Sequence, residues 1–128
     1  MIKLRLLVTG GRDFHDEDKL RRWIFEAVGN ELESDQIQLI HGGARGTDRL
    51  AGRIARQAGF RIRIFPAKWE KYGNAAGIIR NGQMFAESNP DVVLAAPGGR
   101  GTNDMVNRVQ KAIKAGAPIR LIDKRKGL

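Results

Sequence analysis

Short runs of aliphatic residues alternate along this chain with longer stretches of helical periodicity. Five runs are rich in Val, Ile and Leu, at residues 4–9, 36–41, 61–65, 91–96 and 118–122. Their length and β-branched content predict buried strands rather than fragments of helix. Between them, apolar residues recur at three- and four-residue spacing, which is typical of helices with one buried face. The pattern therefore predicts the order β-α-β-α-β-α-β-α-β.

Four apolar stripes mark the predicted helices, at residues 20–28, 50–58, 75–85 and 105–113. We expect Asn74 to cap the third helix, and Gly59 and Gly116 to end the second and the fourth. Strands that alternate with helices imply a parallel sheet with right-handed crossovers. The expected fold is α/β: a Rossmann-like, doubly wound, five-stranded parallel sheet in the order 3-2-1-4-5, with helices on both faces.

Composition limits the number of domains and the chemistry. With 128 residues, of which 41% are hydrophobic, we expect a single domain over residues 1–123, followed by a short basic tail at 124–128. No apolar run approaches the roughly 20 residues of a membrane helix, so we expect a cytoplasmic protein without a membrane partner. The absence of cysteine excludes disulfides, zinc–thiolate sites and cysteine nucleophiles.

The charge balance points to an anionic partner. Lys and Arg number 23 against 14 Asp and Glu, which gives a net charge of +9. The sequence pI is about 10.7. Nucleic acid and a phosphorylated small molecule are both compatible with this excess of positive charge.

Three of the predicted strands end in glycine-rich turns, at residues 9–13, 41–48 and 97–104. The second and third turns are near copies, GGARGTD and GGRGTND, and each leads directly into a helix. In the expected order, strands 2, 1 and 4 are neighbours, so the three turns should meet at one carboxyl edge. Open α/β sheets form their ligand crevice at such an edge.

The residue types in these turns suit the capture of an anion. Glycine allows the backbone to approach a ligand closely, and the following helix starts offer free N–H groups. Thr47 and Thr102 are expected to cap a helix or contact phosphate. Arginines bind phosphate through a planar fork, and Arg45 is a further candidate. The expected ligand-binding residues are Gly10, Gly11, Arg12, Gly42, Gly43, Gly46, Thr47, Arg80, Asn81, Pro97, Gly98, Gly99, Arg100, Gly101 and Thr102.

Other polar and aromatic residues allow two interpretations each. Asp13 and Asp48 could accept hydrogen bonds from ribose hydroxyls or simply stabilise turns. Trp69 and Tyr72 could stack on a base or cover the edge of the core. His41, at a strand end, is expected to be a structural histidine.

Known cofactor patterns are missing from the chain. Neither GxGxxG nor GxxxxGK[ST] occurs, which disfavours a conventional NAD enzyme or P-loop NTPase. We expect no cofactor. We also expect no metal site, because His and carboxylates do not cluster at metal-ligand spacing.

Four motifs carry a resemblance to a known family. The segment PGGRGT at 97–102 matches the PGGxGT loop of the SLOG superfamily, which includes the Lonely-guy phosphoribohydrolases and the Smf/DprA proteins. The order GGRDF, HGGARGTDRLA, PAKWEKYGNAAGIIRNGQM and APGGRGTNDM most resembles its YspA (cpYpsA-related) branch. The resemblance covers about residues 6–118. It implies a Rossmann-like fold, a nucleotide or a derivative such as ADP-ribose as ligand, and pairing into homodimers.

The Lonely-guy enzymes also suggest which residues would matter for hydrolysis. They pair PGGxGTxxE with RKxxM, and an arginine and the glutamate are linked to cleavage of an N-glycosidic bond. Arg80 and Met84 keep that spacing here, with Asn81 in place of the lysine, but the glutamate position is Met105. A thioether cannot transfer a proton, and Met105 is expected to face the core. Asp104 lies about 100° around the helix and does not replace the glutamate.

These observations leave three functions open. The first is the binding of a phosphorylated, nucleotide-derived ligand, a nucleoside monophosphate or an ADP-ribose-like compound, by a sensor or sequestering module. The alternative is a phosphoribohydrolase-type enzyme, with Arg80, Asp13 and Asp48 as catalytic candidates. A second alternative is nucleic-acid binding as in DprA. We expect that binding to be weak and non-specific, because aromatic residues make up only 6% of the chain.

Overall fold

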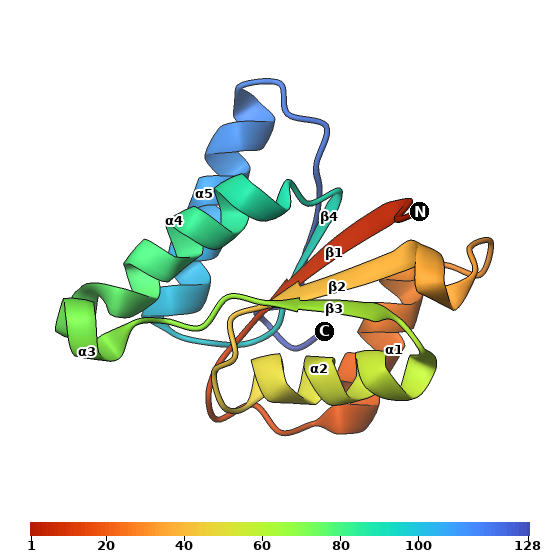
Figure 1. Ribbon diagram of the computed structural model, residues 1–128, viewed down its shortest axis with the longest axis horizontal. Coiled ribbons are helices and arrows are strands. Elements are labelled where there is room, and N and C mark those ends of the chain that lie inside the picture. The colour runs from red at the N-terminus through yellow and green to blue at the C-terminus, as the bar shows by residue number, and fades with distance from the viewer.

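The computed structural model describes all 128 residues and contains one parallel sheet of five strands (Figure 1). The sheet order is β3-β2-β1-β4-β5, and every neighbouring pair is parallel. The α/β fold and the strand order expected from the sequence are therefore confirmed. The strands are β1 (Leu4–Thr9), β2 (Ile37–His41), β3 (Arg61–Ile64), β4 (Val92–Ala95) and β5 (Arg120–Asp123).

Helices cover both faces of the sheet, as the alternation predicts. α1 and α2 lie on one face and α4 and α5 on the other (Figure 1). A short helix and two 3₁₀ turns complete the chain. The bounds are α1 (Glu17–Val28), η1 (Ser34–Gln36), α2 (Thr47–Ala58), α3 (Trp69–Tyr72), η2 (Gly73–Ala75), α4 (Ala76–Ser88) and α5 (Arg100–Lys114). None of these helices has the length and apolar character needed to cross a membrane.

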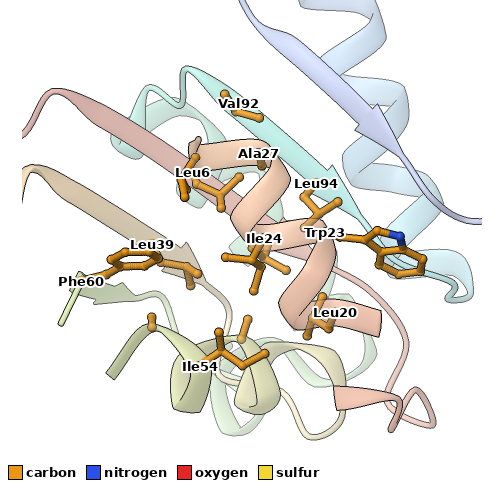
Figure 2. Packing of buried hydrophobic residues seen from close by; sticks show 14 of the residues in the cluster. Leu6, Leu20, Trp23, Ile24, Ala27, Leu39, Ile54, Phe60, Val92 and Leu94 are labelled. Atoms are coloured by element: carbon orange, nitrogen blue, oxygen red, sulfur yellow. The ribbon is translucent and has the colours of Figure 1, made fainter. Parts of the chain in front are cut away.

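The larger core lies between the sheet and the pair α1 and α2. Leu6, Leu39 and Leu94 come from three adjacent strands and are fully buried. They pack near Ile24 of α1 and Ile54 of α2 (Figure 2). Because side chains alternate across a strand, Leu6 points into this core while Leu7 points to the other face of the sheet.

The smaller core lies under α4 and α5. Leu7 and Val93 of the sheet pack with Met84 of α4 and with Met105 and Val109 of α5. Met105 is fully buried, which confirms that it faces the core.

Three expectations about burial and capping are wrong. Strands β3 and β5 are largely exposed or half-buried, because each has only one neighbour in the sheet. Asn74 does not cap α4: it lies within the 3₁₀ turn η2, which runs into the helix with helical backbone angles at Ala75. Ile78 and Ile79 are 39% and 42% exposed, because α4 turns its Ala76, Asn81 and Met84 face inward instead.

The basic tail folds back onto the domain. The guanidinium of Arg125 donates to Asp123 at 2.8 Å and to Asn103 at 3.0 Å. Lys19 donates to the carbonyl of Gly127 at 3.0 Å. The carboxyl end of the chain therefore contacts both α1 and the start of α5.

Candidate functional site

The three glycine-rich turns meet at the carboxyl edge of the sheet, as their place in the sequence predicts. Gly11, after β1, donates its N–H to the carbonyl of Pro97 at 2.8 Å, and its own carbonyl accepts the N–H of Thr47 at 3.1 Å. The turn after β1 is thus bonded to both of the others. A cleft opens above the turns and is bounded on its far side by α3 and α4.

Several predicted ligand-binding residues hold the turns together instead of lining the cleft. Gly46 has φ +78°, and a Cβ there would overlap the carbonyls of Gly11 and Arg12. A Cβ on Gly98 would overlap the backbone nitrogen of Gly11 in the neighbouring turn, as well as the hydroxyl of Thr102. These glycines are therefore required for close contact between loops.

The predicted roles of the two threonines need correction. The N-caps of α2 and α5 are Gly46 and Gly99, so neither Thr47 nor Thr102 caps a helix. Thr47 is fully buried, and its hydroxyl donates to the carbonyl of Gly11 at 3.0 Å. That bond joins the start of α2 to the turn after β1.

The main lobe of the cleft has a volume of about 420 Å³. It combines residues from all three turns with residues of α3, η2 and α4. Predicted site residues that line it are Gly10, Gly11, Arg12, Asp48, Arg80, Asn81, Gly99, Arg100, Gly101 and Thr102. The remaining lining residues are Thr9, Ala44, Trp69, Asn74, Gly77, Ile78 and Met84.

A second lobe of about 500 Å³ adjoins the main lobe and shares four residues with it: Arg12, Ala44, Trp69 and Arg80. The predicted residues Gly42 and Gly43 lie here, together with Arg45, Arg49, Pro66 and Ala67. Neither lobe contains Asp13, Gly46, Thr47, Pro97 or Gly98. Asp13, Pro97 and Gly98 instead line a shallower groove beside Phe14, which shares Gly11, Arg12 and Gly99 with the main lobe.

The start of α5 is open toward solvent. Its N-cap, Gly99, makes no side-chain capping bond, and its first turn contains no acidic residue. Nothing lies within 4 Å of where a Cβ would stand on Gly99 or Gly101. The first N–H groups of a helix lack partners within the helix and form the positive end of its dipole. This end of α5 is therefore suited to an anion.

The matching start of α2 already holds an anion of the chain itself. Asp48 is only 5% exposed, and its Oδ2 accepts the N–H groups of Gly42 and Ala44, each at 3.1 Å. Burial raises the pKa of Asp48 to about 6, opposed by these hydrogen bonds and by the charge of Arg80. In the near-copy before α5 the equivalent residue is the uncharged Asn103, which is exposed. Of the two helix starts, only that of α5 has no carboxylate in its first turn.

Arg80 is held in place by backbone carbonyls. Its Nη1 donates to Gly42 at 2.5 Å and to Phe65 at 3.3 Å, and its Nε donates to the side chain of Asn81 at 3.2 Å. Burial lowers the pKa of Arg80, while the nearby Asp48 charge acts in the opposite direction. An arginine stays charged at neutral pH, so a fixed positive charge faces both lobes.

The side chain of Asn81 joins α4 to α5. Its amide donates to the carbonyl of Gly101 at 2.9 Å and to Asp104 at 3.1 Å. Asp104 also pairs with Arg108 at 2.9 Å and lines neither lobe. With Met105 in the core, Asp48 is the one carboxylate that lines the cleft.

The remaining aromatic and basic candidates of the sequence analysis differ in whether they line the cleft. The guanidinium of Arg12 lies 5.2 Å from the ring centre of Trp69, and both line the two lobes. Tyr72 lines neither lobe. His41 is buried, and its Nδ1 accepts the N–H of Gly43 at 2.9 Å, which confirms a structural role. Burial lowers the pKa of His41 to about 4.

Comparison with known proteins places the chain in a family. The model of the YspA, cpYpsA-related SLOG family matches residues 4–72, which include the turns after β1 and β2. The Gene 61 protein of Mycobacterium phage D29 is 39% identical over 117 residues, covering 84% of this chain and 90% of that protein. The X-ray structure of TM1055, a Northeast Structural Genomics Consortium target, matches this chain with a TM-score of 0.59 at 21% identity. The match covers 82% of this chain and 67% of the TM1055 chain, and it shows a shared fold. This chain belongs to the YspA, cpYpsA-related SLOG family.

Proposed function

We propose that this protein binds a phosphorylated, nucleotide-derived ligand in the main lobe, as a sensor or sequestering module. The observation that carries the proposal is the start of α5, an N-terminus with no carboxylate in its first turn, beside arginines that have no ion-pair partner. The N–H groups after Gly99 donate to a phosphate, and Arg100 and Arg80 contribute their charge. A nucleoside monophosphate and an ADP-ribose-like compound both carry such a group.

Other residues of the lobe suit the remainder of a nucleotide. Oδ1 of Asp48 receives no hydrogen bond from the chain and can accept one from a ribose hydroxyl. Trp69 is 46% exposed and offers a face on which a base can stack. Membership of a SLOG family is in keeping with a nucleotide-related ligand.

Thermal unfolding with and without AMP or ADP-ribose tests the proposal. A ligand that binds only the folded state at 100 times its Kd stabilises the protein by about 2.7 kcal/mol, so the Tm should rise. Arg100→Ala and Gly99→Val should abolish that rise, and the valine fits the free protein because the space around Gly99 is empty. Arg22→Ala is the matched control, since it removes the same charge from an exposed position on α1. A rise that persists in both cleft variants places the ligand elsewhere.

One observation favours a second candidate function, hydrolysis of the N-glycosidic bond of a nucleoside monophosphate. Asp48 lies in the same lobe as Arg80, and its pKa near 6 allows it to hold and donate a proton near neutral pH. We nevertheless expect slow or no turnover, because the buried Met105 supplies no second carboxylate. The assay is release of ribose 5-phosphate and free base by the wild type, Arg80→Ala and Asp48→Asn. Robust turnover by the wild type that is lost in both variants would overturn the binding-module proposal in favour of a hydrolase.

A further inference from the structure

Positively charged side chains gather around the second lobe, beyond those that a phosphate at the start of α5 would contact. Four arginines line it: Arg12, Arg45, Arg49 and Arg80. No carboxylate lines it, because Asp48 borders the main lobe only. Like charges repel one another when they are brought together, and an anion placed among them removes that repulsion.

The two arginines that belong to the second lobe alone are free to bind. Arg45 lies in the turn before α2 and Arg49 in the first turns of that helix, and both side chains are exposed. Neither takes part in an ion pair or in a side-chain hydrogen bond of the chain. By contrast Arg53, one turn further along α2, is paired with Glu17 at 3.2 Å. Arg45 and Arg49 are therefore unpaired arginines at the end of α2 that faces the cleft, whereas Arg56, which also has no ion-pair partner, lies at the far end of the helix and lines neither lobe.

The two lobes adjoin each other, because four residues line both. Arg12 and Arg80 line both, and Arg80 is fixed to the carbonyl of Gly42, a residue of the second lobe. Small-molecule sites are commonly about 300–1,000 Å³, and each lobe, at about 420 and 500 Å³, is by itself within that range. A ligand that crosses from one lobe to the other passes the charges of Arg12 and Arg80, of which Arg80 is held by backbone carbonyls.

We propose that the second lobe binds a second phosphoryl group of the same ligand, separated from the first by a nucleoside. This inference rests on the proposed function, since it assumes that the first phosphoryl group lies at the start of α5. The ligand is then a short, 5′-phosphorylated dinucleotide or an equivalent bis-phosphorylated nucleotide. A nucleoside monophosphate fills only half of the site.

Calorimetric titration of the whole chain with AMP, ADP and 5′-phosphorylated diadenylate (pApA) tests this inference. The wild type should bind pApA at least tenfold more tightly than AMP, and ADP should gain less than pApA because its two phosphates are adjacent. In Arg45→Gln/Arg49→Gln that tenfold gain should vanish, while affinity for AMP stays within twofold of the wild type. The control Arg53→Gln/Arg56→Gln removes the same charge from exposed positions of the same helix and should keep the gain.

Each possible outcome has a separate meaning. If the wild type binds AMP but binds pApA no better, or if the gain survives in Arg45→Gln/Arg49→Gln, the second lobe is not a phosphate site and only this inference fails. If neither AMP nor pApA binds, the proposed function fails with it. Tetraadenylate should bind no more tightly than pApA. Affinity that continues to rise with strand length would overturn the small ligand in favour of a nucleic-acid strand.

Discussion

Replacing Asp48 with asparagine should change how the stability of this protein depends on pH. The pKa of Asp48 is raised from 3.8 to about 6 in the folded protein. The folded state therefore binds more protons than the unfolded chain between about pH 4 and pH 6, and stability falls as the pH rises through this window. At about 1.36 kcal/mol for each pKa unit, the loss amounts to about 3 kcal/mol.

His41 acts in the opposite direction over nearly the same window. Its pKa is lowered from 6.5 to about 4, so here the unfolded chain binds the extra proton. Its contribution to stability is complete above pH 6.5 and is lost as the pH falls toward 4, again by about 3 kcal/mol. In the wild type the two contributions offset one another between pH 4 and pH 6.

Urea unfolding at pH 4, 5, 6 and 7 checks this reasoning. The difference in unfolding free energy between Asp48→Asn and wild type should grow in favour of the variant by about 3 kcal/mol from pH 4 to pH 7. The amide oxygen of asparagine can still accept the N–H groups of Gly42 and Ala44, so the turn keeps its shape. Asp13→Asn, which removes a carboxylate from an exposed position, is the matched variant. A difference for Asp48→Asn that stays constant with pH would refute the assignment of a buried, proton-holding carboxyl.

Three further outcomes follow from the geometry. Gly46→Ala should destabilise the protein by at least about 2 kcal/mol more than Gly29→Ala in urea unfolding, since both glycines have positive φ but only Gly46 faces backbone carbonyls; equal effects would contradict the close contact between loops. Met105→Glu should cost about 3–5 kcal/mol and produce no release of free base, because the carboxyl enters the apolar core; a stable, active variant would reverse our view of this position. Single-stranded DNA should bind with a Kd on the order of 10⁻⁶ M or weaker near physiological salt, and more weakly as salt rises in a fluorescence titration; tight binding that survives added salt would favour the DprA-like alternative.

The sheet and the meeting of its three turns could be predicted because both follow from local patterns. Runs such as those containing Leu6, Leu39 and Leu94 are too short for helices and too apolar for loops, and their alternation with helices fixes a parallel sheet. Once β1 is central, the turns after β2 and β4 must lie on either side of the turn that follows it.

Which turn residues line the cleft and which pack against a neighbouring loop could not be predicted in the same way. Whether a glycine faces the ligand or a neighbouring loop depends on distances across the sheet, so Gly46 and Gly98 were assigned to the site although they pack between loops. The burial of Asp48 likewise depends on tertiary contacts. Arg49 is not among the residues expected from the sequence, although it lies in the first turn of the helix that follows the glycine-rich turn containing Arg45.

The anchoring of Arg80 to backbone carbonyls affects the affinity with which an anion can bind. A long, flexible side chain normally loses rotamer freedom when it binds a ligand, which weakens binding by up to about 2 kcal/mol. The bonds from Arg80 to Gly42 and Phe65 impose that loss while the chain folds. An incoming anion therefore meets a cation that is already oriented, and the cost of ordering this side chain is not subtracted from the free energy of binding.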